Sequence, residues 1–471
     1  MAQYTKHPAA PLPAAPARET TGHLMVRGLG IIALFCVFAH TAVYNLVGPI
    51  GAGIVTLVVT AAMLAVWIPA IAHQRPTRFP WRRLPWTALG YAALALISLL
   101  WSRWPAATAT TWPVLLAVTV TALFVASMLT WQEIIRALST VMKFILALSL
   151  AIELWVALVL QHPLLPNFLE VPDEIDPHLY WVRGNLFDGG RIQGIVGNAH
   201  TLAMMCLFAL IVFGVLFVAR ARRRGALLVW AALALVLLVK AASATVYLSA
   251  LVVLVVLTAA LLARAATSPR KRRNVYIGFG AVALVGVVAA WVLRDALLDV
   301  LGKGSDLTGR IEIWNAVWAR AAERPVFGNG FSSPWVPWDP TFDGWILNHG
   351  ITVFHAHNMW LDVFLQLGVV GVILMAIAWL ALLWRSWFFA VDRPRWDLDA
   401  QRPYSAIALA PVLLVAVLLI EGLAESAPIM LWGWLLLVML SFKIKSVPLV
   451  GVGLSERTPL ISHGAKARQV P

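Results

Sequence analysis

Residues 226–263 read ALLVWAALALVLLVKAASATVYLSALVVLVVLTAALLA, a nearly continuous apolar run interrupted at Lys240-Ala-Ala-Ser243. A helix needs about 20 residues to cross the hydrocarbon core of a bilayer, so this run is long enough to cross twice. A second such run, residues 28–72, is interrupted at Asn45-Leu-Val-Gly-Pro49. Each run therefore predicts two consecutive membrane-spanning helices.

The composition is that of an integral membrane protein. Hydrophobic residues make up 61% of the 471 residues and charged residues 12%, whereas soluble domains average about 25% charged residues. Apolar runs of spanning length recur along the whole chain, so we expect an all-α polytopic membrane protein with about 12 transmembrane helices. The expected spans are approximately 28–46, 51–72, 87–102, 112–130, 139–160, 196–218, 226–242, 245–263, 276–293, 358–384, 404–422 and 427–442.

Positive charge is divided unevenly between the two sets of connecting segments. One set, which includes both tails, holds 27 of the 36 Lys and Arg residues, because nine fall in the other set. An excess of Lys and Arg marks cytoplasmic segments, so we expect an inner (cytoplasmic) membrane protein with both termini in the cytoplasm. The net charge of +14 then reflects topology and contact with anionic membrane lipids, and no nucleic-acid partner is expected.

This topology divides the chain into three parts. Residues 1–27 form a disordered cytoplasmic tail, residues 28–442 a transmembrane catalytic domain, and residues 443–471 a second cytoplasmic tail. Two larger loops, at about 161–195 and 294–357, lie on the outer face, where every other connection is short. We therefore expect the active site on the outer face.

The later outer loop contains a predicted amphipathic, interfacial helix over residues 309–324. Thr308 is a candidate N-cap, and Pro325 ends the helix. Arg310 falls in the first turn, where free backbone N–H groups and a guanidinium together suit an anion such as a phosphate. The alternative is an ordinary surface helix whose Arg310 pairs with Glu312 or a lipid phosphate. The expected apolar stripe consists of Ile311, Trp314, Val317, Trp318 and Ala321.

Two histidines follow in the same loop. His355 and His357 lie directly before the span that begins near Asn358. Their spacing does not place both on one helix face, which disfavours a two-His metal site on a helix, whereas one His at the membrane surface suits general-base catalysis. Between the helix and the histidines, Gly328-Asn-Gly330 predicts a turn that lets the backbone approach another segment closely.

The earlier outer loop carries further polar residues where the chain re-enters the membrane. Arg183, Arg191 and Gly194 precede Asn198 and His200. Asn198 and His200 lie at the start of an apolar helix and are costly there unless they are paired or line a cavity.

Other charged residues have simpler interpretations. The acidic run Asp173-Glu174-Ile-Asp176 is more typical of a solvated loop than of a cation site. Four more charged residues lie at or within apolar segments, namely Glu153, Lys240, Glu421 and Glu425. For Lys240 and Glu425, which lie near helix ends, the simplest interpretation is that the charged group snorkels to water.

The pattern resembles the signature region of the O-antigen ligase and polymerase superfamily of membrane glycosyltransferases. It consists of Arg310…Trp314…Pro325-x-x-Gly328-x-Gly330…His357-Asn358…Gly368-x-x-Gly371 together with Arg191-x-x-Gly194…Asn198. The resemblance covers about residues 185–210 and 305–372 and favours the ligase-like branch. The chain departs from the family at Ser243-Ala-Thr245, where members often have Ser-Arg, and Lys240 is a candidate substitute for that charge.

The resemblance implies transfer of a glycan from an undecaprenyl-diphosphate carrier to a glycan or glycolipid acceptor. Arg310 and Arg191 would hold the diphosphate, and His357 would be the general base. The wider set of expected substrate-binding residues is Arg183, Arg191, Asn198, Trp314, Gly330, His355 and Asn358. Because Arg can neutralise a diphosphate leaving group, we expect no metal and no other cofactor.

Three alternatives remain open from the sequence. The chain could instead polymerise lipid-linked repeat units, transport or flip lipid-linked oligosaccharides, or serve as a structural membrane partner. A transporter would not explain why Arg310 and His357 are concentrated on one face.

Overall fold

The computed structural model describes residues 21–72, 79–169, 179–221, 223–292, 309–348, 351–392 and 404–447. These residues form a helical bundle with one pair of two-residue antiparallel strands, β1 (Leu347–Asn348) and β2 (Ile351–Thr352). The α-helices are α1 (Thr21–Phe38), α2 (His40–Ala72), α3 (Trp86–Ile97), α4 (Pro105–Met128), α5 (Trp131–Trp155), α6 (Ala199–Val218), α7 (Arg224–Ala241), α8 (Ala244–Ala265), α9 (Pro269–Val292), α11 (Arg310–Ala322), α12 (Met359–Val391), α13 (Ala410–Ala424) and α14 (Leu431–Ser446). Short helical turns are η1 (Trp81–Arg83), η2 (Ser98–Leu100), η3 (Val156–Leu160), η5 (Gly194–Val196), η6 (Ile407–Leu409) and η7 (Ala427–Ile429).

The bundle has the character of a polytopic membrane protein. Within the described ranges, nine helices are long and apolar enough to cross a membrane. Each of the 12 expected spans overlaps a helix, but α3, α9 and α14 are not among the nine. The polytopic helical class is therefore confirmed, whereas the count of 12 and the sidedness of the loops remain predictions. Of the two expected tails, residues 21–27 lie in α1 and residues 443–446 in α14, whereas residues 1–20 and 448–471 lie outside the described residues, as does the acidic run at 173–176.

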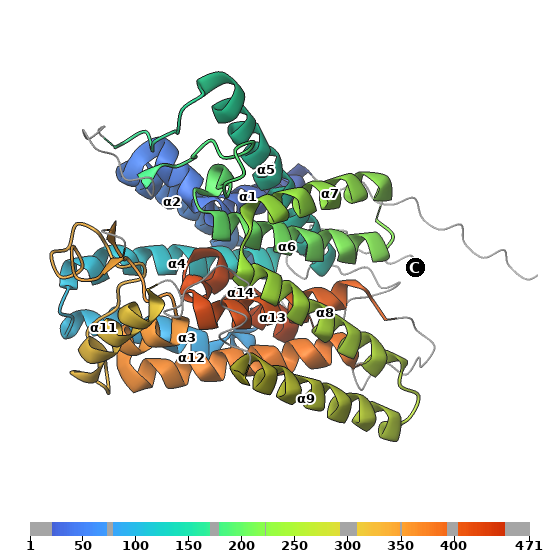
Figure 1. Cartoon of the computed structure of the whole chain (residues 1–471). Coiled ribbons are helices and arrows are strands. Elements are labelled where there is room, and N and C mark those ends of the chain that lie inside the picture. The colour runs from blue at the N-terminus through green and yellow to red at the C-terminus, as the bar shows by residue number, and fades with distance from the viewer. Residues whose placement is uncertain are drawn as a thin grey trace, which may run out of the picture.

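The centre of the bundle consists of helices that are apolar on all sides. Nearly every residue of α13 and α14 is buried, and α6 is almost as enclosed. Helices of this kind must be surrounded by protein or lipid on every face, since they have no polar face to expose. In Figure 1, α13 and α14 accordingly lie in the middle of the bundle, with α4, α8 and α12 around them.

Both predicted interruptions of the long apolar runs are observed. In α2 the helical path breaks at Gly48, which has φ 73°. The second run separates into α7 and α8 at Ala242, a left-handed residue with φ 45°. Glycine adopts positive φ without the steric cost that a Cβ brings, which explains why the first break occurs at Gly48.

A further break, inside α12, was not predicted. Gly368 has φ 61°, and the segment after α11 docks against the backbone groups that the break leaves free. Gly330 N donates to Gln366 O at 2.9 Å, and Val369 N donates to Pro325 O at 2.8 Å. A Cβ at Gly328 would lie 2.4 Å from the backbone of Gln366. The close approach expected at Gly328–Gly330 is therefore confirmed, and its partner is the broken part of α12.

Helix α11 packs on α12 at one end of the bundle, on the left in Figure 1. Its buried face consists of Ile313, Val317 and Ala321. Of the predicted stripe, Val317 and Ala321 lie on this face, whereas Ile311 is 41% exposed and Trp318 57% exposed. The face that packs on protein follows the i, i+4 spacing from Ile313, which turns it away from both exposed residues. The N-cap is Gly309, and the predicted cap Thr308 lies outside the described residues.

Candidate functional site

The two histidines sit in a short extended segment between β2 and α12. Ala356, which separates them, is fully buried, and its N–H donates to Asp362 Oδ2 at 3.3 Å. Its carbonyl accepts a hydrogen bond of 3.1 Å from Trp314 Nε1. His357 has φ 49°, so the chain turns and the two imidazole rings face one another with centroids 4.0 Å apart. Trp314, an expected substrate-binding residue, thus holds the histidine segment in place.

Glu425, directly after α13, joins these histidines to Arg310. Its Oε2 accepts from His357 Nδ1 at 2.8 Å, and its Oε1 accepts from Arg310 Nη2 at 2.7 Å. His355 Nδ1 lies 4.0 Å from Oε2. The side chains of Arg310, His357 and Glu425 are 17%, 26% and 12% exposed, so the contacts are partly shielded from water. We refer to Arg310, His355, His357 and Glu425 as the outer cluster, after the outer face on which the sequence predicts them.

Charge and burial set the protonation of two members of the outer cluster. Burial alone would raise the pKa of the Glu425 carboxyl, but the hydrogen bond from His357 and the charges of neighbouring histidines lower it below its ordinary value. Burial, followed by the charge of His357, lowers the pKa of His355 to about 3. Glu425 is therefore an anion, and His355 is a neutral imidazole, at any physiological pH.

A second His–Glu pair lies one helical turn before the first. Glu421 Oε1 contacts His200 Nε2 at 2.6 Å, and His200 Nδ1 contacts Ser243 Oγ at 2.8 Å. Glu421 is fully buried, and its Oε2 has no hydrogen-bond partner among the described residues. The sequence predicts that His200 must be paired or line a cavity to be tolerated in an apolar helix, and it does both.

The arginines of the earlier loop belong to a neighbouring network. Arg191 Nε donates to Ala241 O at 3.0 Å, two residues before Ser243. Burial, and then the charge of Arg183, lowers the pKa of Arg191. The loop itself is held by Glu153, whose Oε1 accepts from the backbone N–H groups of Gln193 and Gly194 at 2.8 Å each. The two arginines thus lie close together beside the α7–α8 turn.

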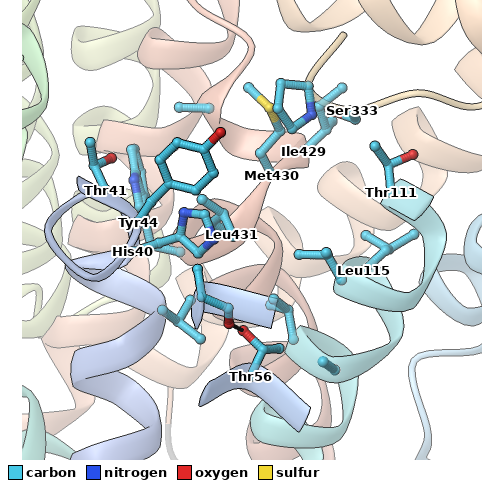
Figure 2. A pocket seen from close by; sticks show the side chains of 18 of the residues that line it. His40, Thr41, Tyr44, Thr56, Thr111, Leu115, Ser333, Ile429, Met430 and Leu431 are labelled. Atoms are coloured by element: carbon cyan, nitrogen blue, oxygen red, sulfur yellow. Dashed lines mark hydrogen bonds between the residues drawn. The ribbon is translucent and has the colours of Figure 1, made fainter. Parts of the chain in front are cut away.

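A cavity of about 860 Å³ reaches both His–Glu pairs. Its polar lining includes Asn198, His200, His355, His357, Glu421 and Glu425. From there it follows α4 from Thr110 to Val120, ten residues or about 15 Å of helix. Figure 2 shows His40, Tyr44 and Thr56 of α2 on one wall, with Thr111 and Leu115 of α4 on another. The cavity therefore joins a charged end to a mainly apolar channel.

The remaining expected residues have structural roles in the contacts observed. Asn358 caps α12, where its Oδ1 accepts from Trp360 N at 2.9 Å, and Asn198 caps α6 by accepting from Thr201 N at 3.0 Å. Gly330 lies against Ser102 and accepts from Trp104 Nε1 at 2.9 Å. Lys240, the candidate substitute for the family's arginine, donates from Nζ to Leu186 O at 3.1 Å.

One interpretation from the sequence was wrong at the outer cluster. Glu425 does not snorkel, because its side chain is only 12% exposed and is held in an ion pair with Arg310. The argument against paired histidine ligands applies only to a helix, and His355 and His357 lie outside one. Their Nδ1 or Nε2 atoms and a Glu425 oxygen lie within 4.8 Å of one another, a spacing that could also accommodate a metal ion. The only signal for Glu425 in the sequence is a carboxylate at the end of an apolar segment.

Fold and site together define a polytopic helical membrane protein with a charged cluster at one end of an internal cavity. Residues 241–376 match the family model described as O-antigen ligase. Over 123 residues the chain is 30% identical to the exopolysaccharide production protein ExoQ of Rhizobium meliloti (strain 1021). This alignment covers 24% of this chain and 27% of ExoQ. These matches support the resemblance found in the sequence, over part of the chain.

The matches cover only part of each protein. The chain aligns with about a quarter of the length of ExoQ. The family segment contains Arg310, His355 and His357, whereas Arg191 and Glu425 lie outside it. By their descriptions, the proteins that this segment resembles act in O-antigen ligation and in exopolysaccharide production.

Proposed function

We propose that the protein transfers a glycan from an undecaprenyl-diphosphate carrier to an acceptor hydroxyl at the outer face of the cytoplasmic membrane. The observation that carries this proposal is the outer cluster, which places an arginine and a histidine on one carboxylate at the end of a mainly apolar cavity. Such a site combines the two requirements of the reaction. The leaving diphosphate needs positive charge, and the attacking hydroxyl needs a base.

Arg310 is our candidate for the diphosphate-binding residue. Arg310 donates one hydrogen bond to Glu425 in the described part of the chain. A guanidinium has five N–H donors, so others can bind a diphosphate. The N-cap Gly309 has no side chain with which to cap the first turn of α11, and the first backbone N–H groups of a helix can bind an anion. We propose that Arg191 and Arg183 add charge from the α7–α8 side.

His357 is our candidate for the general base. An ionised carboxylate only accepts hydrogen bonds, so the contact with Glu425 requires a proton on His357 Nδ1 and leaves Nε2 as the basic nitrogen. In the proposed step the acceptor oxygen bonds to the anomeric carbon while the bond from that carbon to phosphate breaks. The electron pair of the broken bond leaves with undecaprenyl diphosphate, and the hydroxyl proton passes to Nε2.

The apolar part of the cavity would hold the isoprenoid chain of the donor. Its walls on α2 and α4 are lined by residues such as Ala52, Leu57, Leu64 and Val118. The isoprenoid chain already lies in the bilayer, which is as apolar as these walls, so the channel would orient the donor by packing and not through a hydrophobic gain in affinity. The proposed location brings the diphosphate to the charged end, beside Arg310.

The test uses purified protein in liposomes with a defined undecaprenyl-diphosphate-linked glycan and an acceptor. We expect a glycosylated acceptor and free undecaprenyl diphosphate in equal amounts, and loss of both products in His357→Gln. Movement of the lipid-linked glycan across the bilayer without either product would instead support a transporter.

Polymerisation is the second candidate, because the similar protein ExoQ is described as an exopolysaccharide production protein. A polymerase uses a second lipid-linked glycan as acceptor. In cells lacking the protein, accumulation of single lipid-linked repeat units would support polymerase, whereas accumulation of full-length lipid-linked polymer would support ligase.

A further inference from the structure

We infer that Glu425 is a positioning residue that sets both the orientation of Arg310 and the tautomer of His357. This inference rests on the proposed function and concerns a residue outside the matched family segment. The two oxygens of the carboxylate are divided between the two partners, Oε1 with Arg310 at 2.7 Å and Oε2 with His357 at 2.8 Å. Glu425 therefore connects the proposed leaving-group site with the proposed base.

The position of Glu425 relative to His357 is fixed by backbone contacts. Glu425 N donates to Glu421 O at 2.7 Å, which closes the last turn of α13. Asn358 Nδ2 donates to Leu423 O at 3.2 Å and so ties the residue after His357 to the end of α13. Asn358 also caps α12, so the two helix ends are held together directly beside the outer cluster. The carboxylate thus lies on a rigid support.

On Arg310 the carboxylate acts by limiting a long side chain. An arginine side chain has about 2 kcal/mol of rotamer entropy, part of which is lost whenever it is held for a ligand. The hydrogen bond to Glu425, with Arg310 17% exposed, holds the guanidinium before the donor arrives. The guanidinium therefore loses its conformational entropy when the protein folds and not when the donor binds.

On His357 the carboxylate acts through the ring proton. Acceptance from Nδ1 selects the tautomer with a basic Nε2, and the negative charge stabilises the imidazolium that forms when Nε2 takes a proton. An amide in place of the carboxylate would offer one acceptor and one donor. It could not accept from Arg310 and His357 together, and donation to Nδ1 would select the opposite tautomer.

The experiment compares Glu425→Gln and Glu425→Asp with the wild-type protein in the liposome transfer assay. We expect Glu425→Gln to lower kcat by about 100-fold or more, with a smaller change in the KM for the donor. Glu425→Asp keeps the charge but is one methylene shorter, so it should recover part of kcat.

The matched control is Glu323→Gln, which removes a carboxylate paired with Arg103 outside the outer cluster. It should retain wild-type kcat. Thermal unfolding in detergent reports folding separately, so a purely structural role predicts less folded protein with unchanged kcat per folded molecule. That outcome would overturn the positioning role. An inactive wild-type protein would instead overturn the proposed function.

Discussion

Replacement of Arg310 by Ala is expected to nearly abolish glycan transfer. The guanidinium uses one N–H on Glu425 at 2.7 Å and retains others for the diphosphate. Removal of one charge-assisted contact to the leaving group should cost about 2–4 kcal/mol of transition-state stabilisation, or about 30- to 1000-fold in rate. Loss of the cation also leaves the buried carboxylate of Glu425 without one partner, so some loss of stability should accompany it.

The assay measures single-turnover release of undecaprenyl diphosphate from purified protein in liposomes, together with thermal unfolding. Arg310→Lys restores charge without the bidentate fork and should recover little of the rate. Arg320→Lys is the matched control, since Arg320 lies on the same helix but contacts Thr341 O and the Trp345 ring. Transfer by Arg310→Ala within about threefold of the wild-type rate would refute the assignment.

Three further outcomes follow from the site and the cavity. Gly53→Phe should raise the KM for the full-length donor much more than the KM for a short-chain analogue, because Gly53 lines the cavity and a Cβ there meets no atom within 4 Å. Gly214, the site of the control Gly214→Phe, does not line the cavity. Equal effects of Gly53→Phe on both donors would argue against a lipid channel. His355 has its pKa lowered to about 3 and so remains neutral between about pH 5 and pH 8; His355→Asn should therefore leave the shape of the pH–rate curve unchanged, whereas loss of an acid limb would contradict this. EDTA should leave the rate unchanged, and loss of activity restored by magnesium or manganese would instead indicate a metal bound by the histidines and Glu425.

The local sequence was sufficient to predict the helices, the breaks between them and one close approach of the backbone. The apolar runs predicted the helices, and Gly48 and the Lys240–Ser243 segment predicted the breaks between them. The glycines at 328 and 330 predicted a close backbone approach because only a residue without Cβ fits there. The break at Gly368 was missed because it lies within an apolar run of ordinary spanning length, where the docked segment satisfies the backbone.

The partners within the site could not be predicted, because they depend on packing between distant helices. Glu425 is 68 residues from His357 and 115 from Arg310 along the chain. A carboxylate at the end of an apolar helix is usually solvated, and nothing in the local sequence distinguishes a buried one. The pair of Glu421 and His200, 221 residues apart, is hidden for the same reason. Sequence reasoning thus identified Arg310 and the histidines, whereas the structure supplied the carboxylate between them.

The most direct measurement of the central claim is the yield of two products from one purified protein. Liposomes that contain the wild-type protein, a labelled undecaprenyl-diphosphate-linked glycan and an acceptor should produce glycosylated acceptor and undecaprenyl diphosphate in a ratio of about one to one, as the proposed bond exchange requires. His357→Gln should bind the donor and form neither product. Release of undecaprenyl diphosphate without glycosylated acceptor, or equal yields from His357→Gln, would contradict a histidine-activated glycan transferase.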